Sequence, residues 1–313
     1  MCEKKVVAAL LLGVAVAAQA QAETSLTLNA ALGYRYDSLD WNIAGNIAGQ
    51  NPNILSELSW TSLKTPQVTV AMELRGGDWY LLGDASFGRI VGGSNQDSDY
   101  LFDNRQGEYS RSNNKPGGDM ADATVGLAYR FERILKHEIL PSTRRHYVMP
   151  MAGYSYHSQN LRMTDGFQTI PATGSFPGLN STYDARWRSL WAGFSFVGED
   201  AHDNSAFAID IALHAAKFYA VAGWNLRVGP PSGFMQPKSF EQDAYGGGFT
   251  VAVRGRNELD KKMFFSWSVN YGLWRTETGL DTVYIHDGSI SYTRLNEVNW
   301  ETMSVNLGLG VRL

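Results

Sequence analysis

Apolar residues alternate with small or polar ones over long stretches of this 313-residue chain. Between 305 and 313 every odd-numbered residue is Val or Leu, and the residues between them are Asn, Gly, Gly and Arg. The same alternation runs through 123–131, 207–214 and 265–273. Successive side chains of a β-strand point to opposite faces, so the pattern predicts strands with one apolar face and one small or polar face.

Length and aromatic placement separate these strands from those of a soluble β-sandwich. The stretch 205–227 contains no strong turn signal, whereas strands of globular proteins average roughly 5–6 residues. Aromatic residues fall near the expected strand ends, as at Trp79, Tyr129, Tyr219 and Trp274, which is typical of the girdles of membrane barrels. A mean hydropathy of −0.25 is compatible with a barrel, because its lipid face is averaged with a polar interior.

The turn signals divide the chain into ten strands joined alternately by short and long connections. An even number of strands, with short turns at one end and long loops at the other, is typical of the bacterial outer membrane. Only a closed sheet satisfies every backbone group in lipid, so the first and last strands should pair. The prediction is an all-β, ten-stranded antiparallel transmembrane β-barrel with long extracellular loops. Its strands are expected at 25–36, 53–74, 79–91, 120–131, 146–163, 183–197, 205–227, 241–255, 263–276 and 291–313, and its long loops near 37–53, 92–119, 164–182, 228–240 and 277–290.

The first residues have the pattern of an export signal. Two lysines precede the apolar run 6–18, and small residues follow it up to Ala22, as in a cleavable signal peptide. The run is shorter than the roughly 20 residues that a spanning helix needs. We therefore expect 1–22 to be removed together with Cys2, the single cysteine, leaving 23–313 as one barrel in the outer membrane.

Charge and composition exclude several classes of protein. The chain has 27 Lys+Arg against 31 Asp+Glu, a formal net charge of −4, so no basic surface of the nucleic-acid-binding kind is predicted. No His-x-x-x-His spacing occurs, and neither a metal nor another cofactor is predicted. A Gly-x-Ser-x-Gly elbow is also absent from the sequence, which argues against a serine hydrolase.

Three motifs follow one another on the outer connections and the adjoining strands. Ser-Leu-Asp-Trp at 38–41 lies in the first long loop, and the second long loop contains the acidic segment 92–100. Met-Ala-Gly-Tyr at 151–154 is followed by Gly-Ser-Phe-Pro at 174–177 and by a returning strand over 183–193. In this order the motifs resemble the omptins, the outer-membrane proteases of Gram-negative bacteria. The resemblance implies a ten-stranded barrel with a peptide-cleaving site at its outer mouth.

The omptin resemblance implies a water molecule held between an acidic pair and an Asp–His pair. Asp97 and Asp99 match the acidic pair. Two carboxylates two residues apart on an extended segment point to the same side, so they can share a water or a proton. The His of the second pair would act as the general base. The alternative is that Asp97 and Asp99 belong to a solvated polar loop or to an adventitious Ca²⁺ site.

The Asp–His half of that site has no match. In omptins it follows a Gly-Trp strand end, but Gly223-Trp224 here leads into 225–233, which contains neither Asp nor His. The dipeptide His286-Asp287 lies in the fifth outer loop, but adjacent residues of an extended chain face opposite ways. Asp210 and His214 lie on the same interior face of one strand and are interpreted as structural.

Omptins also depend on lipopolysaccharide, whose phosphates they hold with basic residues of the outer face. Tyr154 and Arg186 match two such positions, and Arg188 faces the same outward side as Arg186. Guanidinium groups bind phosphates in a bidentate manner. The resemblance thus implies lipopolysaccharide as a partner, which an active omptin would also require. The alternative, favoured for Arg188, is an ordinary interfacial arginine.

Three functions are compatible with these patterns. The preferred hypothesis is an omptin-like barrel that is catalytically divergent or inactive and serves as an envelope or surface component binding lipopolysaccharide. The alternative is an omptin-like aspartyl-type endopeptidase that cleaves extracellular peptides or proteins near basic residues. A narrow pore is disfavoured, since interior residues such as Arg130, Asp210, His214 and Arg254 are expected to fill the lumen of ten strands.

Overall fold

The structure, a computed structural model, describes residues 24–131, 144–200, 202–229 and 233–313. The expected signal peptide at 1–22 lies outside the described residues, as does most of the expected inner turn at 132–145. Within the described ranges, no helix has the length and apolarity needed to cross a membrane.

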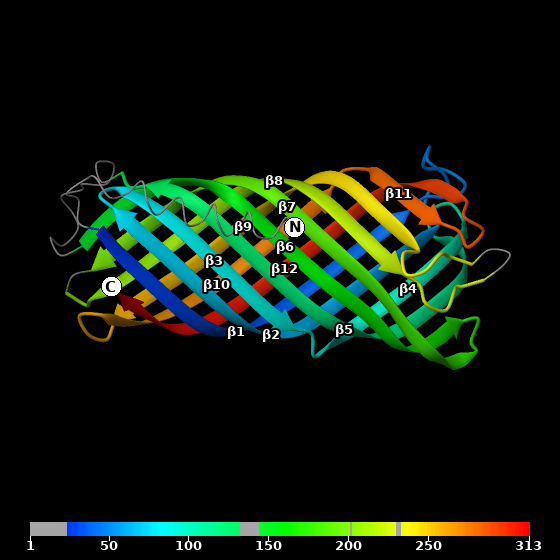
Figure 1. Cartoon of the computed structure of the whole chain (residues 1–313), viewed down its shortest axis with the longest axis horizontal. Helices are drawn as coiled ribbons and strands as arrows, with labels where there is room; N and C mark the ends of the chain where they lie inside the picture. Colours follow the sequence, from blue (N-terminus) through cyan, green and yellow to red (C-terminus); the bar gives the residue numbers. More distant parts are fainter. Residues whose placement is uncertain (1–23, 132–143, 201, 230–232) are drawn as a thin grey trace.

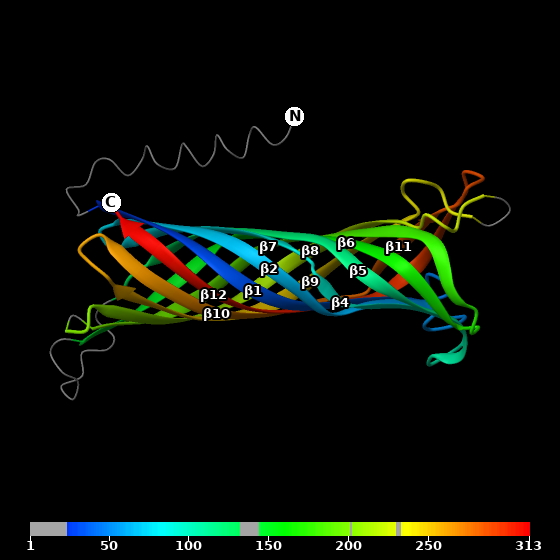
Figure 2. The same cartoon turned by 90° about the horizontal axis from the view of Figure 1, so that it is seen from below.

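The described residues form an all-β structure of antiparallel strands, drawn as one elongated barrel in Figures 1 and 2. Its strands are β1 (Thr24–Ile43), β2 (Ser56–Gly76), β3 (Trp79–Arg89), β4 (Gly92–Phe102), β5 (Gln106–Tyr129), β6 (Arg144–Ile170), β7 (Gly174–Asp200), β8 (Ser205–Gly223), β9 (Phe240–Glu258), β10 (Met263–Thr276), β11 (Gly279–Tyr284) and β12 (Ile290–Arg312).

The sheet closes into a ring of ten antiparallel strands, which confirms the predicted fold. Around the ring the order is β1, β12, β10, β9, β8, β7, β6, β5, β3, β2 and again β1. The first and last strands pair as expected, from Thr27 opposite Arg312 to Ile43 opposite Leu295. The short strands β4 and β11 extend the wall beyond β3 and β10, between β2 and β5 and between β9 and β12.

The two ends of the barrel differ. The tight β2–β3 and β9–β10 turns lie at the end where β1 begins and β12 finishes, and we call it the inner end. Figure 2 shows β4 and β11 toward the opposite, outer end. In barrels of the bacterial outer membrane the short-turn end faces the periplasm and the other end faces outward.

Most of the outer segments expected to be loops are strands, which corrects their sequence-based boundaries. β1 continues through Ile43, β4 and β5 occupy most of 92–119, and the β6–β7 hairpin runs to Ile170 before returning at Gly174. In the expected loop at 228–240, the described part has an isolated bridge at Phe234 before β9 begins at Phe240. The long connections are therefore mainly extensions of the barrel wall.

A belt of apolar side chains faces outward around the inner half of the barrel. Leu32, Leu190 and Leu213 are each about two-thirds exposed or more, at 71%, 69% and 67%. Such a continuous apolar surface is stable in lipid and would be a liability in water. The inner half is thus the membrane-spanning part.

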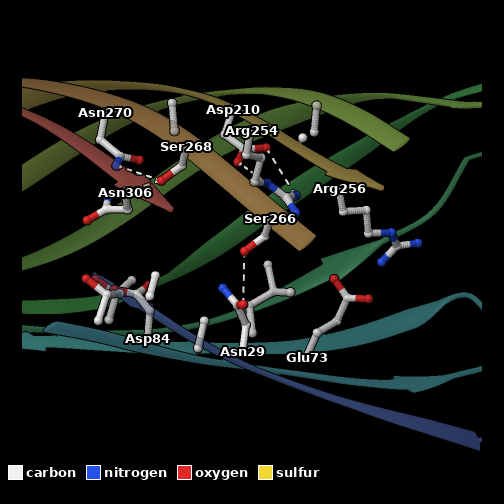
Figure 3. A pocket seen from close by; sticks show the side chains of 18 of the residues that line it. Asn29, Glu73, Asp84, Asp210, Arg254, Arg256, Ser266, Ser268, Asn270 and Asn306 are labelled. Carbon is white, nitrogen blue, oxygen red and sulfur yellow. Dashed lines mark hydrogen bonds and ion pairs between the residues drawn. The ribbon is translucent and has the colours of Figure 1, made fainter. Parts of the chain in front are cut away.

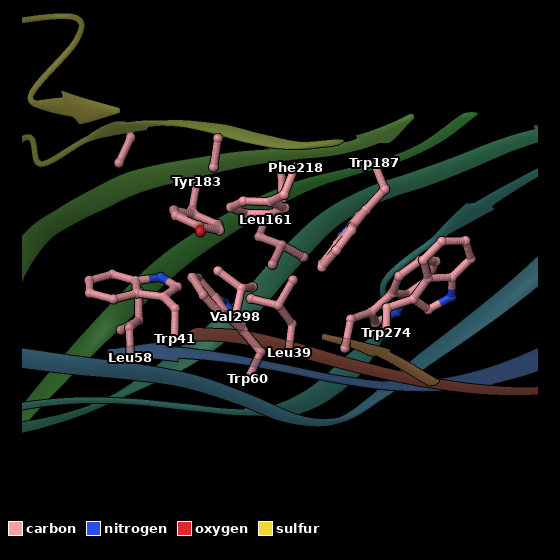
Figure 4. Packing of buried hydrophobic residues seen from close by; sticks show 14 of the residues in the cluster. Leu39, Trp41, Leu58, Trp60, Leu161, Tyr183, Trp187, Phe218, Trp274 and Val298 are labelled. Atoms are coloured by element: carbon pink, nitrogen blue, oxygen red, sulfur yellow. The ribbon is translucent and has the colours of Figure 1, made fainter. Parts of the chain in front are cut away.

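The outer half has the opposite arrangement, with apolar side chains inside. Leu39, Trp41, Leu58, Trp60, Tyr183, Trp187, Phe218, Trp224, Phe240, Trp274, Val298 and Trp300 are among the buried residues of one cluster, which we call the aromatic plug (Figure 4). Trp274 and Trp300 stack with their ring centroids 5.4 Å apart, and Trp41 and Tyr183 stack at 5.9 Å. The plug provides this part of the barrel with a packed hydrophobic core.

Candidate functional site

The expected acidic pair lies on β4, in the outer wall of the barrel. Asp97 is directly opposite Leu58 of β2, whose side chain is fully buried in the plug. Asp99, two residues further along the strand, is only 6% exposed. The structure therefore brings Asp97 and Asp99 to the interior side of the outer rim, just above the plug, as the two-residue spacing predicted.

The described charged groups that act on Asp97 are Asp99 and the cation Arg227, and no histidine is among them. Burial raises the pKa of Asp97, and the negative charge of Asp99 raises it further, while the positive charge of Arg227 opposes the shift. Arg227 also acts on nearby Tyr109, whose pKa is raised by burial and by Asp99. Arg227 follows Gly223-Trp224, in the segment where the omptin resemblance requires the Asp–His pair. The site can hold a proton, but the charges acting on Asp97 come from a carboxylate and a guanidinium, and no imidazole is among them.

An Asp–His pair does exist, but it lies elsewhere. His157 of β6 is directly opposite Asp122 of β5, and its Nδ1 is 2.8 Å from an Asp122 carboxylate oxygen. The His157 ring packs against Trp274 and Trp300 at the lower side of the plug and lines the lumen below it. The two residues are 35 positions apart in the sequence, so no local motif contains both. The register between β5 and β6 brings them together.

A row of hydrogen bonds continues from this pair around the barrel wall. His157 Nε2 lies 3.0 Å from the Ser155 hydroxyl, which lies 2.7 Å from that of Ser189. His214 then joins Ser189 at 3.1 Å and the Thr250 hydroxyl at 3.0 Å. Asp122, His157 and Ser155 have the order of a hydrolase triad, but Ser155 is only 1% exposed. Its hydroxyl therefore has no path to a substrate, and the row is structural.

Arg35 connects this polar row to the plug through ion pairs with two carboxylates. Its guanidinium donates to Asp37 at 2.7 Å and also pairs with Asp122. The indole N–H of Trp300 donates to the same Asp37 at 2.9 Å. The side chains of Arg35 and Asp37 are 5% and 0% exposed. One buried guanidinium thus pairs with two carboxylates directly below the aromatic cluster.

The three residues expected to contact lipopolysaccharide share one outward surface. Arg188 of β7 is opposite Tyr156 of β6 and Lys217 of β8, one register row above Leu190 and Tyr154. Arg186 occupies the next outward position. Neither arginine makes an ion pair with any residue in the described part of the chain. Lys217 pairs with Asp243 and lies over the Tyr245 ring at 4.2 Å. We call Arg186, Arg188 and Lys217 the outer basic patch.

A cavity of about 1020 Å³ fills the lumen below the plug (Figure 3). Its lining runs from Glu199 and Glu258 near the inner end up to His157 and Trp300. Asp210 and Arg254, expected to fill the lumen, form a cross-strand ion pair at 2.7 Å on the cavity wall. The interior side chains therefore leave space in the inner half, and the plug occupies the outer half.

Comparisons with known proteins agree with this architecture. The chain matches the family described as Pom, Protochlamydia outer membrane protein, over residues 29–313. The outer membrane protease OmpT from Escherichia coli superposes with a TM-score of 0.69 at 11% identity, covering 92% of this chain and 97% of that one. This confirms the omptin-like fold, and at such low identity it shows the fold alone.

Other outer-membrane barrels are more distant. The translocator domain of the autotransporter NalP from Neisseria meningitidis gives a TM-score of 0.38 at 10% identity, covering 99% of this chain and 96% of that one. The outer membrane protein OprG from Pseudomonas aeruginosa gives 0.33 at 10% identity, covering 94% and 98%. A comparison with curated protein sequences gives no match.

Proposed function

The chain belongs to the Protochlamydia outer membrane protein family, and from its site we propose that it is a non-proteolytic, omptin-fold barrel whose outer surface binds lipopolysaccharide. Its place as a β-barrel of the outer membrane follows from the family and the fold. The proposal concerns what the barrel binds there and what it does not cleave.

The proposal rests on Arg186 and Arg188 of the outer basic patch, which make no ion pair with the residues that the structure describes. Arg186 and Arg188 lie just above the apolar belt, at the level where lipid head groups meet the outer surface of the barrel. A guanidinium at that level that is not held in an ion pair by the described residues is available for bidentate hydrogen bonds to phosphate. Tyr154 and Tyr156 beside them offer the amphipathic rings typical of a membrane interface.

The groups around Asp97 support the proposal that the barrel does not cleave peptides. General-base catalysis requires a group that can accept the proton of the attacking water within hydrogen-bond reach. The charged groups that act on Asp97 are Asp99 and Arg227. Arg227, which does not accept protons, takes the place of the histidine base that the omptin resemblance requires, and Asp99 is the other member of the acidic pair. The described Asp–His pair lies below the plug, with His157 held between Asp122 and Ser155.

We expect the double variant Arg186→Ala/Arg188→Ala to bind lipid A at least about tenfold more weakly, because each arginine supplies a charge-assisted contact worth about 1.5–3 kcal/mol. Binding is measured as co-sedimentation of the refolded barrel with vesicles containing diphosphorylated lipid A. Vesicles with dephosphorylated lipid A distinguish phosphate recognition from general insertion.

Arg162→Ala is the matched control for this variant. Arg162 is also exposed on β6, opposite Thr182, and lies further from the apolar belt than Arg186. The same loss of charge at Arg162 should leave the affinity for lipid A within about twofold of that of the unchanged barrel. Equal losses for Arg162→Ala and the double variant would show a diffuse charge effect and contradict a specific patch.

A second candidate function is the omptin-like endopeptidase. One observation favours it: Asp97 and Asp99 are enclosed together and the pKa of Asp97 is raised, as expected for two carboxylates that share a proton. Such a pair at the outer mouth would attract basic peptides and would need lipopolysaccharide to be active, if the omptin resemblance extends to activity.

We expect the unchanged barrel to cleave a quenched peptide containing paired arginines no faster than the Asp97→Asn variant does. This should hold both with and without lipopolysaccharide. Asp165→Asn is the control, because Asp165 is exposed near the tip of the β6–β7 hairpin. Lipopolysaccharide-dependent cleavage that survives Asp165→Asn and disappears in Asp97→Asn would establish the endopeptidase instead.

A further inference from the structure

The lumen cavity below the plug has the size and shape of a ligand site. Its volume of about 1020 Å³ is comparable to the larger pockets that hold small organic molecules. The aromatic plug packs the interior beyond its upper end, where His157, Trp274 and Trp300 line it. Residues near the inner end, including Glu258 and Arg312, line its lower part. A ligand would therefore enter from the inner, periplasmic side.

Several charged groups on the cavity wall already have partners of opposite charge. Asp210 pairs with Arg254 at 2.7 Å, and Glu258 pairs with Arg312 at 2.7 Å. Asp122 is bound by Arg35, His157 and Ser86. These pairs leave the corresponding carboxylates with little charge to offer to a ligand.

Asp84 differs from these paired carboxylates. It lies on the interior face of β3, its side chain is exposed to the cavity, and it makes no hydrogen bond or ion pair with any residue that the structure describes. Glu73 of β2, diagonally across the strand pair, likewise makes no hydrogen bond or ion pair in the described chain, although its charge and that of Arg254 interact across the cavity. Figure 3 shows both side chains without the connections that join Asp210 to Arg254. Two unpaired carboxylates thus face one enclosed space.

An apolar and aromatic wall adjoins these carboxylates. The register row next to Asp84 runs from Leu82 through Gly126 and Gly153 to Trp191. The Trp191 indole covers both glycines, because a Cβ at Gly126 or Gly153 would lie 2.5–2.6 Å from its ring atoms. Met149 and Met151 continue this wall toward the inner end. Methionine and tryptophan accommodate apolar groups of varied shape, and tryptophan also attracts cations.

The geometry points to a binding site for an amphipathic organic cation in this cavity. Its ammonium group pairs with Asp84, assisted by Glu73, and its apolar part lies against Leu82, Trp191 and the two methionines. The site is separate from the outer basic patch, so it stands whether or not the barrel binds lipopolysaccharide. A cation enclosed there compensates the charge of a carboxylate that makes no ion pair with the described residues.

The test uses three probes of one shape: 4-phenylbutylamine, 4-phenylbutanol and 4-phenylbutyrate. Binding to the refolded full chain in detergent micelles is measured by isothermal titration calorimetry, with empty micelles as the blank. We expect saturable binding of the amine, at least tenfold tighter than that of the alcohol, and weaker binding still for the carboxylate. Equal affinities for amine and alcohol would overturn the proposal, as would a lack of saturable binding of the amine.

Variants then locate the site. Asp84→Asn should weaken amine binding at least tenfold and leave alcohol binding within twofold, and Glu73→Gln should give a smaller loss. Glu301→Gln, which removes the same charge from the outward face beside Tyr271, should change neither. Because Asp84 makes no hydrogen bond or ion pair with the described residues, the fold should persist in Asp84→Asn, and thermal unfolding checks this. Unchanged amine binding in Asp84→Asn would overturn the assignment.

Discussion

Trp187→Ala should lower the free energy of unfolding by about 3–5 kcal/mol, the range measured when a large aromatic side chain is removed from a packed core. Trp187 is fully buried at the centre of the plug. The centroid of its ring lies 4.7 Å from the ring centroid of Phe218, 5.8 Å from that of Trp274 and 6.2 Å from that of Trp300. Residues from three other strands cannot collapse into the space, because each is held by the barrel wall. Denaturant titration of the refolded barrel measures the loss.

Two controls separate packing from the loss of any aromatic ring. Trp187→Phe keeps most of the volume and removes an indole N–H that has no hydrogen-bond partner among the described residues, so its cost should stay below about 1.5 kcal/mol. Tyr292→Ala removes a ring that is 51% exposed and should cost still less. A loss in Trp187→Ala no larger than in Tyr292→Ala would mean that the plug does not stabilise the barrel.

Arg35→Met should also cost about 3–5 kcal/mol, because removing one partner of a buried ion pair leaves an uncompensated charge. The variant leaves Asp37 without its guanidinium partner and reduces the neutralisation of Asp122. It also removes the cation that lies 5.6 Å from the Trp300 ring. The change in unfolding free energy is again measured by denaturant titration.

The neutralised triple variant Arg35→Met/Asp37→Asn/Asp122→Asn tests the cause. If buried charge is responsible, the two amides should recover at least half of the loss, since neutral groups are less costly to bury than unpaired carboxylates. Arg130→Met is a comparison at the inner end, where the paired Asp78 is 47% exposed and solvent screens the charge. A loss in Arg35→Met no greater than in Arg130→Met would contradict the role of burial.

The alternation of the sequence predicted the membrane part of the barrel well and the outer wall poorly. In lipid the apolar face must point outward, so segments such as 305–313 show their strand character directly. In the outer wall, water surrounds the barrel and the apolar residues Leu58 and Trp60 point inward instead. The stretch 92–119 alternates mainly polar and small residues, which resembles a loop in sequence although β4 and β5 occupy most of it.

Residues close together along one strand were placed correctly by their spacing. Asp97 and Asp99 share the interior side of β4, and Arg186 and Arg188 share the outward side of β7. A period of two residues decides the face of each strand residue without knowledge of its neighbours. The catalytic and lipopolysaccharide roles attached to these residues stay proposals.

The sequence by itself thus determined the class of fold, the number of strands and the side to which each membrane strand turns its residues, because lipid imposes that pattern on every strand separately. Only the tertiary structure decided which residues meet across the lumen. Arg35, Asp122 and His157 come from three strands, and Arg227 lies near Asp97 from a distant connection. Asp84 makes no hydrogen bond or ion pair with the described residues. Barrel closure and strand register set these contacts, and neither can be predicted from the spacing of residues along a single strand.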